Sequence, residues 1–397
     1  MTHAHLAPSM TATQSPPVME ARRWLAAASL PAGLELLNVS QAAPVAPPPA
    51  PLRAAMIAAI EDDDGSHLYG PVLGLPALRD TLAASMTRRY GGPVSDQQIG
   101  ITSGCNQAFA AVISTLAAPG DNVILPVPWY FNHQMWLQMT GVEPRALDTG
   151  PSLLPDPEAA AALIDARTRA IVLVSPNNPC GTEYPDILLA AFRDLAAAHG
   201  LALIVDETYR DFDSRAGAPH SLLQDPDWDE TVISLYSFSK AYRLTGHRVG
   251  AIATSPARLA QVEKFLDTVQ ICAPQLGQRA ALWGLQHLDD WLAGERAEIL
   301  ARRAAMEAAF RDLPDWDLPG CGAYFGYARH RLGIASDALA ERMVSDIGVL
   351  ALPGTMFAPQ GAARGRQEMR FAFANIDAQG ISALADRLAG YAPVSRS

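Results

Sequence analysis

Lys240 is the residue whose type and setting point most clearly to chemistry. The sequence has 30 lysine and arginine residues, and only two of them, Lys240 and Lys264, are lysines. An amine can lose its proton and condense with an aldehyde, whereas a guanidinium can do neither. A lysine kept in a chain that otherwise uses arginine is therefore a candidate for such a reaction. Taken alone, Lys240 could also be a surface residue, and Lys264, on the polar face of an amphipathic helical pattern, is expected to be one.

Hydroxyl groups and an arginine surround Lys240 in the sequence. The segment 237–248 reads Ser-Phe-Ser-Lys-Ala-Tyr-Arg-Leu-Thr-Gly-His-Arg. Ser237, Ser239 and Arg248 in this segment offer two hydroxyls and a guanidinium, which are groups that bind a phosphate dianion. A ligand that carries a phosphate and an aldehyde would bring the aldehyde to Lys240. This arrangement is typical of a loop that binds pyridoxal phosphate (PLP).

A second possible phosphate site lies near residue 103. Ser103, Gly104 and Cys105 follow an expected strand and open an expected helix. Backbone N–H groups at a helix N-terminus, together with a permissive glycine, bind anions well. A serine that only caps the helix has the same pattern. The interpretation of this segment as a phosphate site therefore depends on the segment around Lys240.

Three further segments offer side chains that suit a flat, charged ring. Asp206 directly follows the apolar run 201–205, at the end of a strand where open α/β sheets bind ligands. Its carboxylate can keep a pyridine nitrogen protonated. Tyr209 and Asn178 can hydrogen-bond a ring oxygen, and Tyr130 can stack on the ring. Each residue also has an ordinary explanation, as a helix cap, a packed tyrosine or part of a plain turn.

Arg370 lies in an alternating segment, Met-Arg-Phe-Ala-Phe-Ala, that predicts a strand. An arginine in such a pattern is a surface charge by default. The alternative is a clamp that holds a carboxylate through two parallel hydrogen bonds.

Taken together, these segments closely resemble the class I/II aminotransferases, the aspartate-aminotransferase-like family of fold type I PLP enzymes. The resemblance covers roughly residues 35–375, in the family's order and spacing. It rests on four motifs: Ser-x-Ser-Lys with an arginine eight residues further on, Asn-x-x-Gly, Asp-x-x-Tyr, and a late arginine. It implies an α/β protein with a large, mostly parallel seven-stranded sheet domain and a smaller α+β domain.

The resemblance also implies roles for these residues toward PLP. Lys240 would be the Schiff-base lysine and proton shuttle, and Asp206 would pair with the pyridine nitrogen. Tyr209 and Asn178 would contact the ring oxygen, while Tyr130 would stack on the ring. The residues implied for the phosphate are Ser103, Gly104, Cys105, Ser237 and Arg248.

Substrate and partner roles follow from the same resemblance. Arg370, with Asn178 and Ala43 nearby, would bind the substrate carboxylate. Tyr69 looks like the tyrosine that the family lends to the phosphate site of the partner subunit, which implies a homodimer with shared active sites. Ala43 stands where many members have a glycine.

The implied reaction is a ping-pong transfer of an amino group between an L-amino acid and a 2-oxo acid. The same scaffold also hosts C–S β-lyases and related elimination enzymes, and that alternative stays open. A PLP-binding regulator would need a DNA-binding arm, and a Rossmann-like nucleotide enzyme would need a GxGxxG motif; neither is found in the sequence.

The substrate is expected to be apolar or aromatic. Where dicarboxylate-specific relatives carry a second arginine, the sequence has Asp-Thr-Val-Gln at 267–270. The aromatic and aliphatic residues expected near the pocket are Trp129, Phe131, Leu68 and Phe357.

Composition limits the partners and the compartment. A formal net charge of −11 argues against nucleic acid or an anionic membrane surface as a partner. The four cysteines show neither CxxC spacing nor a metal-ligand pattern, so we expect no metal site, no disulfide framework and a reducing, cytoplasmic setting. No apolar run approaches the roughly 20 residues needed to cross a bilayer.

The pattern of elements must place these side chains together. From residue 98 onward, β-rich runs alternate with alanine-rich helical stretches, which predicts a mostly parallel sheet covered by helices on both faces. The expected strands are Ile99–Thr102, Asn122–Leu125, Ala170–Val174, Leu201–Val205, Thr231–Tyr236 and Val249–Ala253. The last two should be antiparallel, because the loop between them is too short for a helical crossover. The expected helices are Leu52–Asp62, Gln107–Leu116, Asp186–Ala198 and Asp290–Arg311.

The two ends of the chain differ from its middle in composition and in their expected secondary structure. Residues 1–17 are small and polar and are expected to be poorly ordered or wrapped on a neighbour. Strands at Tyr324–Tyr327, Val349–Leu352 and Met369–Phe373 predict the smaller domain. The expected division is an arm and linker over 1–48, packing with the small domain or a partner, a large PLP-binding domain over 49–295, and a small domain over 296–397.

Overall fold

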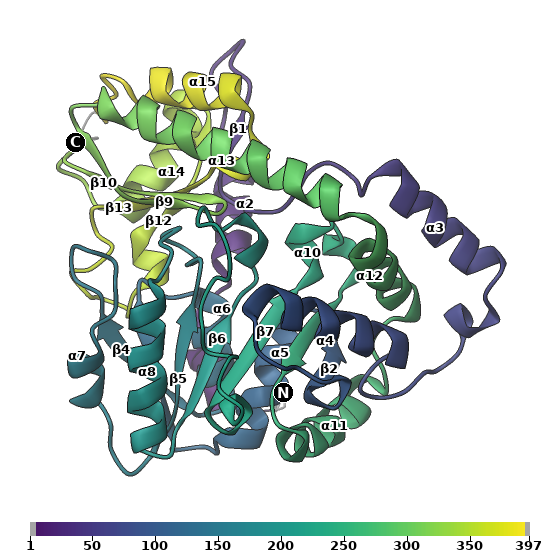
Figure 1. Cartoon of the computed structure of the whole chain (residues 1–397). Coiled ribbons are helices and arrows are strands. Elements are labelled where there is room, and N and C mark those ends of the chain that lie inside the picture. Colours follow the sequence, from purple (N-terminus) through teal and green to yellow (C-terminus); the bar gives the residue numbers. More distant parts are fainter. Residues whose placement is uncertain (1–4, 394–397) are drawn as a thin grey trace.

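The computed structural model describes residues 5–393 and contains a large seven-stranded sheet, in the order β2-β8-β7-β6-β5-β3-β4 (Figure 1). Its strands are β2 (Ile99–Thr102), β3 (Asn122–Val127), β4 (Glu143–Asp148), β5 (Thr168–Val174), β6 (Ala202–Asp206), β7 (Val232–Ser237) and β8 (Gly250–Ala253). Neighbours from β4 to β7 run parallel, whereas β8 is antiparallel to both β7 and β2. The predicted, mostly parallel sheet is confirmed, as is the antiparallel pairing of its last two strands in the sequence, β7 and β8.

β4 is the strand of this sheet that the sequence pattern did not reveal. It lies at the edge of the sheet beside β3. Its sequence is Glu-Pro-Arg-Ala-Leu-Asp, and Leu147 is the one residue of the strand that is buried. An edge strand of this kind lacks the continuous apolar run that predicts the central strands.

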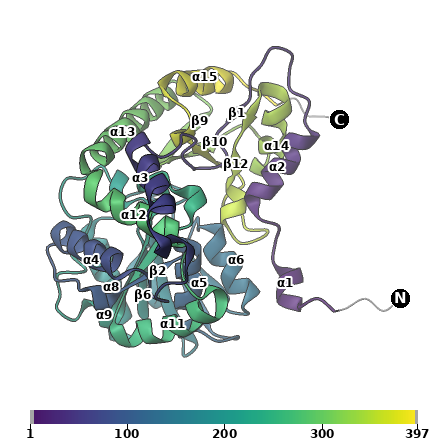
Figure 2. The same cartoon turned by 90° about the vertical axis from the view of Figure 1, so that its right-hand side faces the viewer.

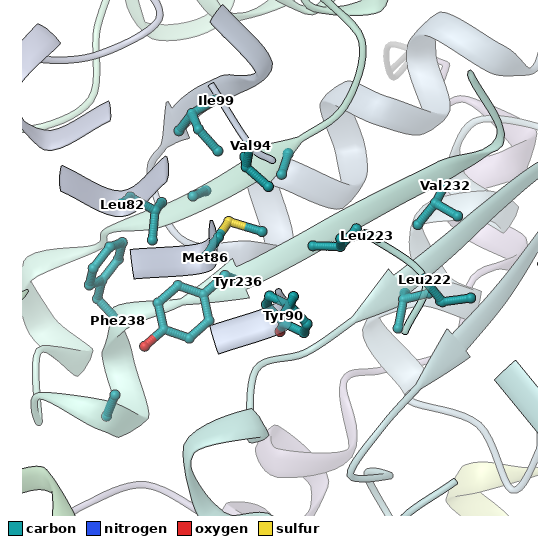
Figure 3. Close-up of a cluster of buried hydrophobic side chains, with 14 of the residues drawn as sticks. Leu82, Met86, Tyr90, Val94, Ile99, Leu222, Leu223, Val232, Tyr236 and Phe238 are labelled. Carbon is teal, nitrogen blue, oxygen red and sulfur yellow. The ribbon is translucent and has the colours of Figure 1, made fainter. Parts of the chain in front are cut away.

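Alternate residues of the central strands enter two cores, one on each face of the sheet. Ile171, Leu203 and Val205 belong to one of these cores, whereas Val172 and Ile204 belong to the core on the other face. The helices of the first core include α4 (Pro76–Tyr90), α8 (Asp186–Ala198) and α12 (Gln275–His287), and those of the second include α5 (Cys105–Leu116) and α11 (Pro256–Gln270). Figure 3 shows part of the first core, where Leu82, Met86 and Tyr90 of α4 lie near Tyr236 of β7.

A second, four-stranded antiparallel sheet forms the smaller domain (Figure 1). Its order is β12-β13-β10-β9, with β9 (Trp316–Gly322), β10 (Phe325–His330), β12 (Leu352–Pro353) and β13 (Glu368–Ala372). The helices around it are α13 (Asp289–Arg311), α14 (Ser336–Ile347) and α15 (Ala378–Leu388), and they share a core of their own with the sheet. The single strand expected at 349–352 is in fact two, because β11 (Val349–Leu350) pairs elsewhere.

The N-terminal arm is more regular than its composition indicated. Within the described residues it forms α1 (Pro8–Ala12) and α2 (Pro17–Ala27), which is more order than the first of the two expectations for residues 1–17 allows, whereas the second, wrapping on a neighbour, stays a prediction. Residues 1–4 lie outside the described part. Proline at the start of each helix supplies the fixed φ that favours the first turn. α2 packs against α14, and β1 (Leu37–Asn38) pairs with β11 of the small domain. α1 buries no residue and lies beside α6 (Phe131–Met139) of the large domain (Figure 2).

The three-part division of the chain stays a prediction. The packing of α2 and β1 on the small domain supports an arm that belongs with that domain. A boundary between residues 295 and 296 would fall inside α13, which continues without a break from 289 to 311.

The remaining helices are short or peripheral. They are α3 (Ala50–Glu61), α6 (Phe131–Met139), α7 (Pro157–Ala161), α9 (Trp228–Thr231) and α10 (Phe238–Ala241). Over residues 5–393 no helix is both long and apolar enough to span a membrane. In the same range no cluster of three or more His, Cys, Asp or Glu residues is placed to hold a metal ion.

Candidate active site

A cavity of about 330 Å³ opens beyond the carboxyl ends of β5, β6 and β7, where the large domain meets the small domain and the arm. This is the place where open α/β sheets bind ligands. The residues predicted from the sequence that line it are Cys105, Tyr130, Asn178, Asp206, Tyr209, Ser237, Lys240, Arg248 and Arg370. Residues spread over more than half of the chain are thus brought to one cavity.

Lys240 sits on α10, the short helix that follows β7. Its Nζ donates a hydrogen bond of 2.6 Å to the main-chain oxygen of Ala42. Burial, followed by the positive charges of Arg248 and Arg370, lowers the pKa of Lys240 to about 8. The amine therefore loses its proton far more readily than an ordinary lysine. Lys264, in contrast, is exposed on α11, as predicted, and its Nζ donates a hydrogen bond to Oε1 of Gln261.

Asp206 is buried at the end of β6, and both of its oxygens have neighbours. Oδ1 accepts hydrogen bonds from the Thr208 N–H, at 3.0 Å, and from the Cys105 thiol, at 3.6 Å. Oδ2 lies 3.2 Å from Nε2 of His133. Burial alone would raise the pKa of Asp206, but His133 and the bonds from Thr208 outweigh it and hold the pKa below its usual value. The carboxyl group is therefore an anion at neutral pH.

His133 is a site residue that the sequence reasoning missed. It lies one turn into α6, three residues after Tyr130, and is buried against the ring of Phe109 with 4.0 Å between ring centroids. Its ring also meets that of Tyr130 edge-on at 4.9 Å. The sequence contained one signal, because a histidine three residues after a proposed stacking aromatic on a helix shares its face.

The segments 103–105 and 237–248, which are both expected to bind the phosphate, meet at one edge of the cavity. Gly104 has a φ of +86°, and a Cβ added there would collide with the guanidinium of Arg248. The backbone of this position therefore favours glycine, and a Cβ there would also displace the guanidinium of Arg248. Arg248 donates to the main-chain oxygens of Thr245, at 3.0 Å, and Ser103, at 3.5 Å.

Arg370 is buried, not a surface charge. Its Nη1 donates a 3.0 Å hydrogen bond to Oδ1 of Asn178, and its Nη2 donates to the main-chain oxygen of Ser40. The guanidinium carbon lies 5.0 Å from the ring centroids of Phe325 and Phe357. Burial lowers the pKa of Arg370 to about 10, which still leaves it charged at neutral pH.

Neither Arg248 nor Arg370 pairs with a carboxylate among residues 5–393, and Nε of Arg370 is buried there without a hydrogen-bond partner. Arg370 is buried, and a buried cation without a counter-charge is costly, whereas Arg248 is exposed to solvent. The cavity lining thus offers two guanidinium groups for anions, together with the amine of Lys240 and the buried carboxylate of Asp206. A phosphate, an aldehyde and a protonated ring nitrogen on one ligand, plus the carboxylate of a second, match this set of groups, so the residues present fit PLP and an amino acid.

Tyr130 lines the cavity, and its hydroxyl makes two hydrogen bonds. The hydroxyl donates a hydrogen bond of 3.2 Å to Oδ1 of Asn106 and accepts one of 2.8 Å from Nδ2 of Asn132. Tyr209 is buried, with its ring 5.2 Å from that of Phe325. Both rings are thus fixed by the protein itself.

Several predicted residues do not line the cavity. Ser103 and Gly104 adjoin the lining residues Cys105 and Arg248, Tyr69 is 79% exposed on the surface, and Ala43 lies beside the lining residues Gln41 and Ala42. Of the four apolar residues expected near the pocket, Phe131 lines it, whereas Trp129 and Phe357 are buried and Leu68 is exposed. Ser239, a hydroxyl expected to bind the phosphate, also lines the cavity, as does Asn106, which directly follows Cys105. Lining residues that were not predicted include Pro16 and Val18 of the arm, Asn132 and Thr208.

The chain is similar in sequence and fold to known proteins. Residues 37–388 match the family described as aminotransferase class I and II. A valine–pyruvate aminotransferase of Mycobacterium tuberculosis is 32% identical over 90% of this chain and 92% of its own, and an arginine–pyruvate transaminase of Pseudomonas aeruginosa is 31% identical over 85% and 86%. An aromatic aminotransferase of Arabidopsis thaliana is 32% identical over 72% and 73%. The solved structure of aspartate aminotransferase from Thermus thermophilus with maleate superimposes with a TM-score of 0.88 over 98% of this chain and 99% of that chain, at 23% identity. The chain therefore belongs to the class I and II aminotransferases, the PLP-dependent transaminases of fold type I.

Proposed function

We propose that this aminotransferase prefers L-amino acids with apolar or aromatic side chains and transfers their amino group to a 2-oxo acid at a single site. The observation that carries the preference is the charge of the cavity wall. Its cationic side chains, among the described residues, are Lys240, Arg248 and Arg370. Each of these has a task in binding PLP or the substrate carboxylate, so none remains to pair with a carboxylate on the substrate side chain.

The rest of the cavity wall supports the same preference. Val18 and Pro16 of the arm and Phe131 of α6 also line it. Val18 also packs in the apolar cluster that contains Phe131 and Phe357. A side-chain carboxylate placed here would lose its water without gaining a partner, which is unfavourable.

The residues of the cavity have the following proposed roles toward the cofactor. When bound, PLP supplies an electron sink that stabilises the negative charge left after a C–H bond is broken. Lys240 binds the cofactor covalently and, once released, carries a proton at Nζ. Asp206 holds a proton at the pyridine nitrogen, with His133 and Cys105 keeping the carboxylate in place. Tyr130 stacks on the ring, and Tyr209 and Asn178 hold its oxygen.

The anionic groups are assigned to the two arginines. Arg248 and Ser237, with the segment 103–105, bind the phosphate. Arg370 binds the substrate carboxylate, and its bond to Asn178 orients the guanidinium. Ala43 stays a predicted neighbour of that carboxylate.

Two features of the assembly belong to the proposal. Leu68 and Tyr69 are large and 64% and 79% exposed, which supports a homodimer in which Tyr69 reaches the partner subunit's phosphate site. All four cysteines are free thiols, which supports a reducing compartment, the cytoplasm. No observation favours a C–S β-lyase.

The experiment that tests the substrate preference compares half-reactions. Methionine, leucine and phenylalanine should convert the bound PLP, followed by its absorbance, at least about tenfold faster per molar substrate than aspartate does. In Val18→Arg the introduced cation should raise the rate with aspartate relative to methionine. Met19→Arg is the matched control, because Met19 is the next residue on α2, is 45% exposed and does not line the cavity. A wild-type enzyme that prefers aspartate would refute the proposal.

A further inference from the structure

Ile271, which ends α11, has a backbone conformation that a β-branched residue rarely adopts. Its φ and ψ are +70° and −61°. The N–H of Cys272 donates a 2.8 Å hydrogen bond to the oxygen of Gln270, which closes a three-residue turn around Ile271. This is the rare and strained form of the γ-turn. The Ile271 N–H is held in turn by the oxygens of Leu266 and Asp267.

The residues on either side of Ile271 bond to two loops far away in the sequence. Oε1 of Gln270 accepts a hydrogen bond from the hydroxyl of Ser103. Sγ of Cys272 accepts a hydrogen bond of 3.4 Å from the N–H of Gly70. The strained turn therefore joins the segment 103–105, at the phosphate edge of the cavity, to the loop that carries Tyr69. Strain of this kind is kept where surrounding contacts impose it.

Ser103 is held at two points. Arg248 donates to its main-chain oxygen, and Gln270 contacts its hydroxyl. The amide nitrogen of Gln270 is buried and has no hydrogen-bond partner among residues 5–393. A buried N–H group without a partner is unfavourable. The oxygen and nitrogen of an amide have similar size, so half a turn of the amide would let its nitrogen donate to Ser103.

We propose that Gln270 is a positioning residue that sets the direction of the Ser103 hydroxyl for phosphate binding. With phosphate present, the amide nitrogen of Gln270 donates to Oγ of Ser103, and the single hydroxyl proton of Ser103 is free to donate to a phosphate oxygen. The turn at Ile271 fixes the end of α11 so that the amide reaches this hydroxyl. The inference rests on the proposed assignment of the segment 103–105 to the phosphate of PLP.

The test compares PLP with pyridoxal, which lacks the phosphate. Apoenzyme is titrated with each ligand, and the two dissociation constants are measured from the quenching of tryptophan fluorescence. Gln270→Ala should weaken PLP about tenfold, the effect of one well-placed hydrogen bond, and change pyridoxal by less than about twofold. Gln270→Glu should weaken PLP further, because a carboxylate accepts the Ser103 proton and repels the phosphate.

Gln261→Ala is the matched control. Gln261 is on the same helix but exposed, and its amide oxygen accepts a bond from Lys264. It should leave both dissociation constants unchanged. Equal weakening of PLP and pyridoxal in the Gln270 variants would reveal a merely structural role and overturn the inference, as would unchanged PLP binding.

Ser103→Ala distinguishes the binding of the phosphate by Ser103 from the positioning of Ser103 by Gln270. If it weakens PLP selectively while the Gln270 variants do not, the positioning role of Gln270 is wrong and the phosphate assignment stands. If Ser103→Ala leaves PLP binding unchanged, the assignment of Ser103 to the phosphate is itself wrong. The proposed role of Gln270 is then wrong as well.

Discussion

Arg370 of the small domain donates a 3.0 Å hydrogen bond to Asn178 of the large domain. The two residues are 192 positions apart in the sequence. Their contact joins β13 to the loop after β5, so the proposed carboxylate site exists only when the two domains are packed together. Five predictions test the site built around this contact.

The first prediction concerns which lysine reacts. Borohydride treatment of the enzyme with PLP should fix the cofactor onto Lys240, because Lys240 lines the cavity whereas Lys264 is exposed on α11. Peptide mapping by mass spectrometry locates the adduct. Lys264→Ala should give the same adduct as the wild type, and an adduct at Lys264 would contradict the assignment.

The second prediction concerns pH. With a pKa of about 8, roughly a tenth of Lys240 is neutral at pH 7, against well under a thousandth for an ordinary lysine. The rate at which apoenzyme captures pyridoxal should therefore rise with pH and level off above about 8. Since the charge of Arg370 helps to lower this pKa, Arg370→Leu should move the inflection to higher pH. An inflection near 10 in the wild type would show that the amine is not perturbed.

The third prediction concerns Asp206. Asp206→Asn should keep PLP, as judged by absorbance after gel filtration, and lower kcat by at least about a hundredfold, because a neutral amide cannot hold the ring nitrogen protonated. His133→Asn should have a smaller effect in the same direction, since it removes one of the contacts that hold the Asp206 pKa low. Near-normal turnover by Asp206→Asn would mean that the acid only caps the turn after β6.

The fourth prediction concerns the substrate carboxylate. Arg370→Ala should raise KM for both the amino acid and the 2-oxo acid by about 10- to 100-fold, because both present the same carboxylate and lose charge-assisted hydrogen bonds. Arg370→Lys should recover only part of the affinity, since an ammonium cannot form two parallel bonds. Steady-state kinetics with each substrate varied in turn measures the effect. A change in only one of the two KM values would place the carboxylate elsewhere.

The fifth prediction concerns shared sites in a homodimer. Tyr69→Phe should weaken PLP retention although Tyr69 does not line the cavity of its own chain. Mixing inactive Lys240→Ala chains with Tyr69→Ala chains, themselves inactive if the tyrosine is essential, should restore activity in heterodimers with one intact site. Sedimentation of the active enzyme gives its mass, and an active monomer would rule out the shared site.

The sequence by itself determined the parts of the site that are local. Lys240, Ser237 and Arg248 lie on one short segment, and Asp206 directly follows a continuous apolar strand, so their proximity to a sheet edge follows from chain connectivity. The central strands were recognisable because helices cover both faces and make each strand apolar throughout. β4, with one buried residue, gave no such signal.

Only the tertiary structure decided the contacts between distant segments. The pattern around Arg370 was that of a surface strand, yet Phe325 and Phe357 bury it. Nothing in the arm indicated that Val18 would line the cavity, or in α11 that Gln270 would contact Ser103. The physical reason is that a period of two or 3.6 residues tells which face of an element is buried, but not which other element covers it. That choice is made by the packing of two domains and an arm around one cavity.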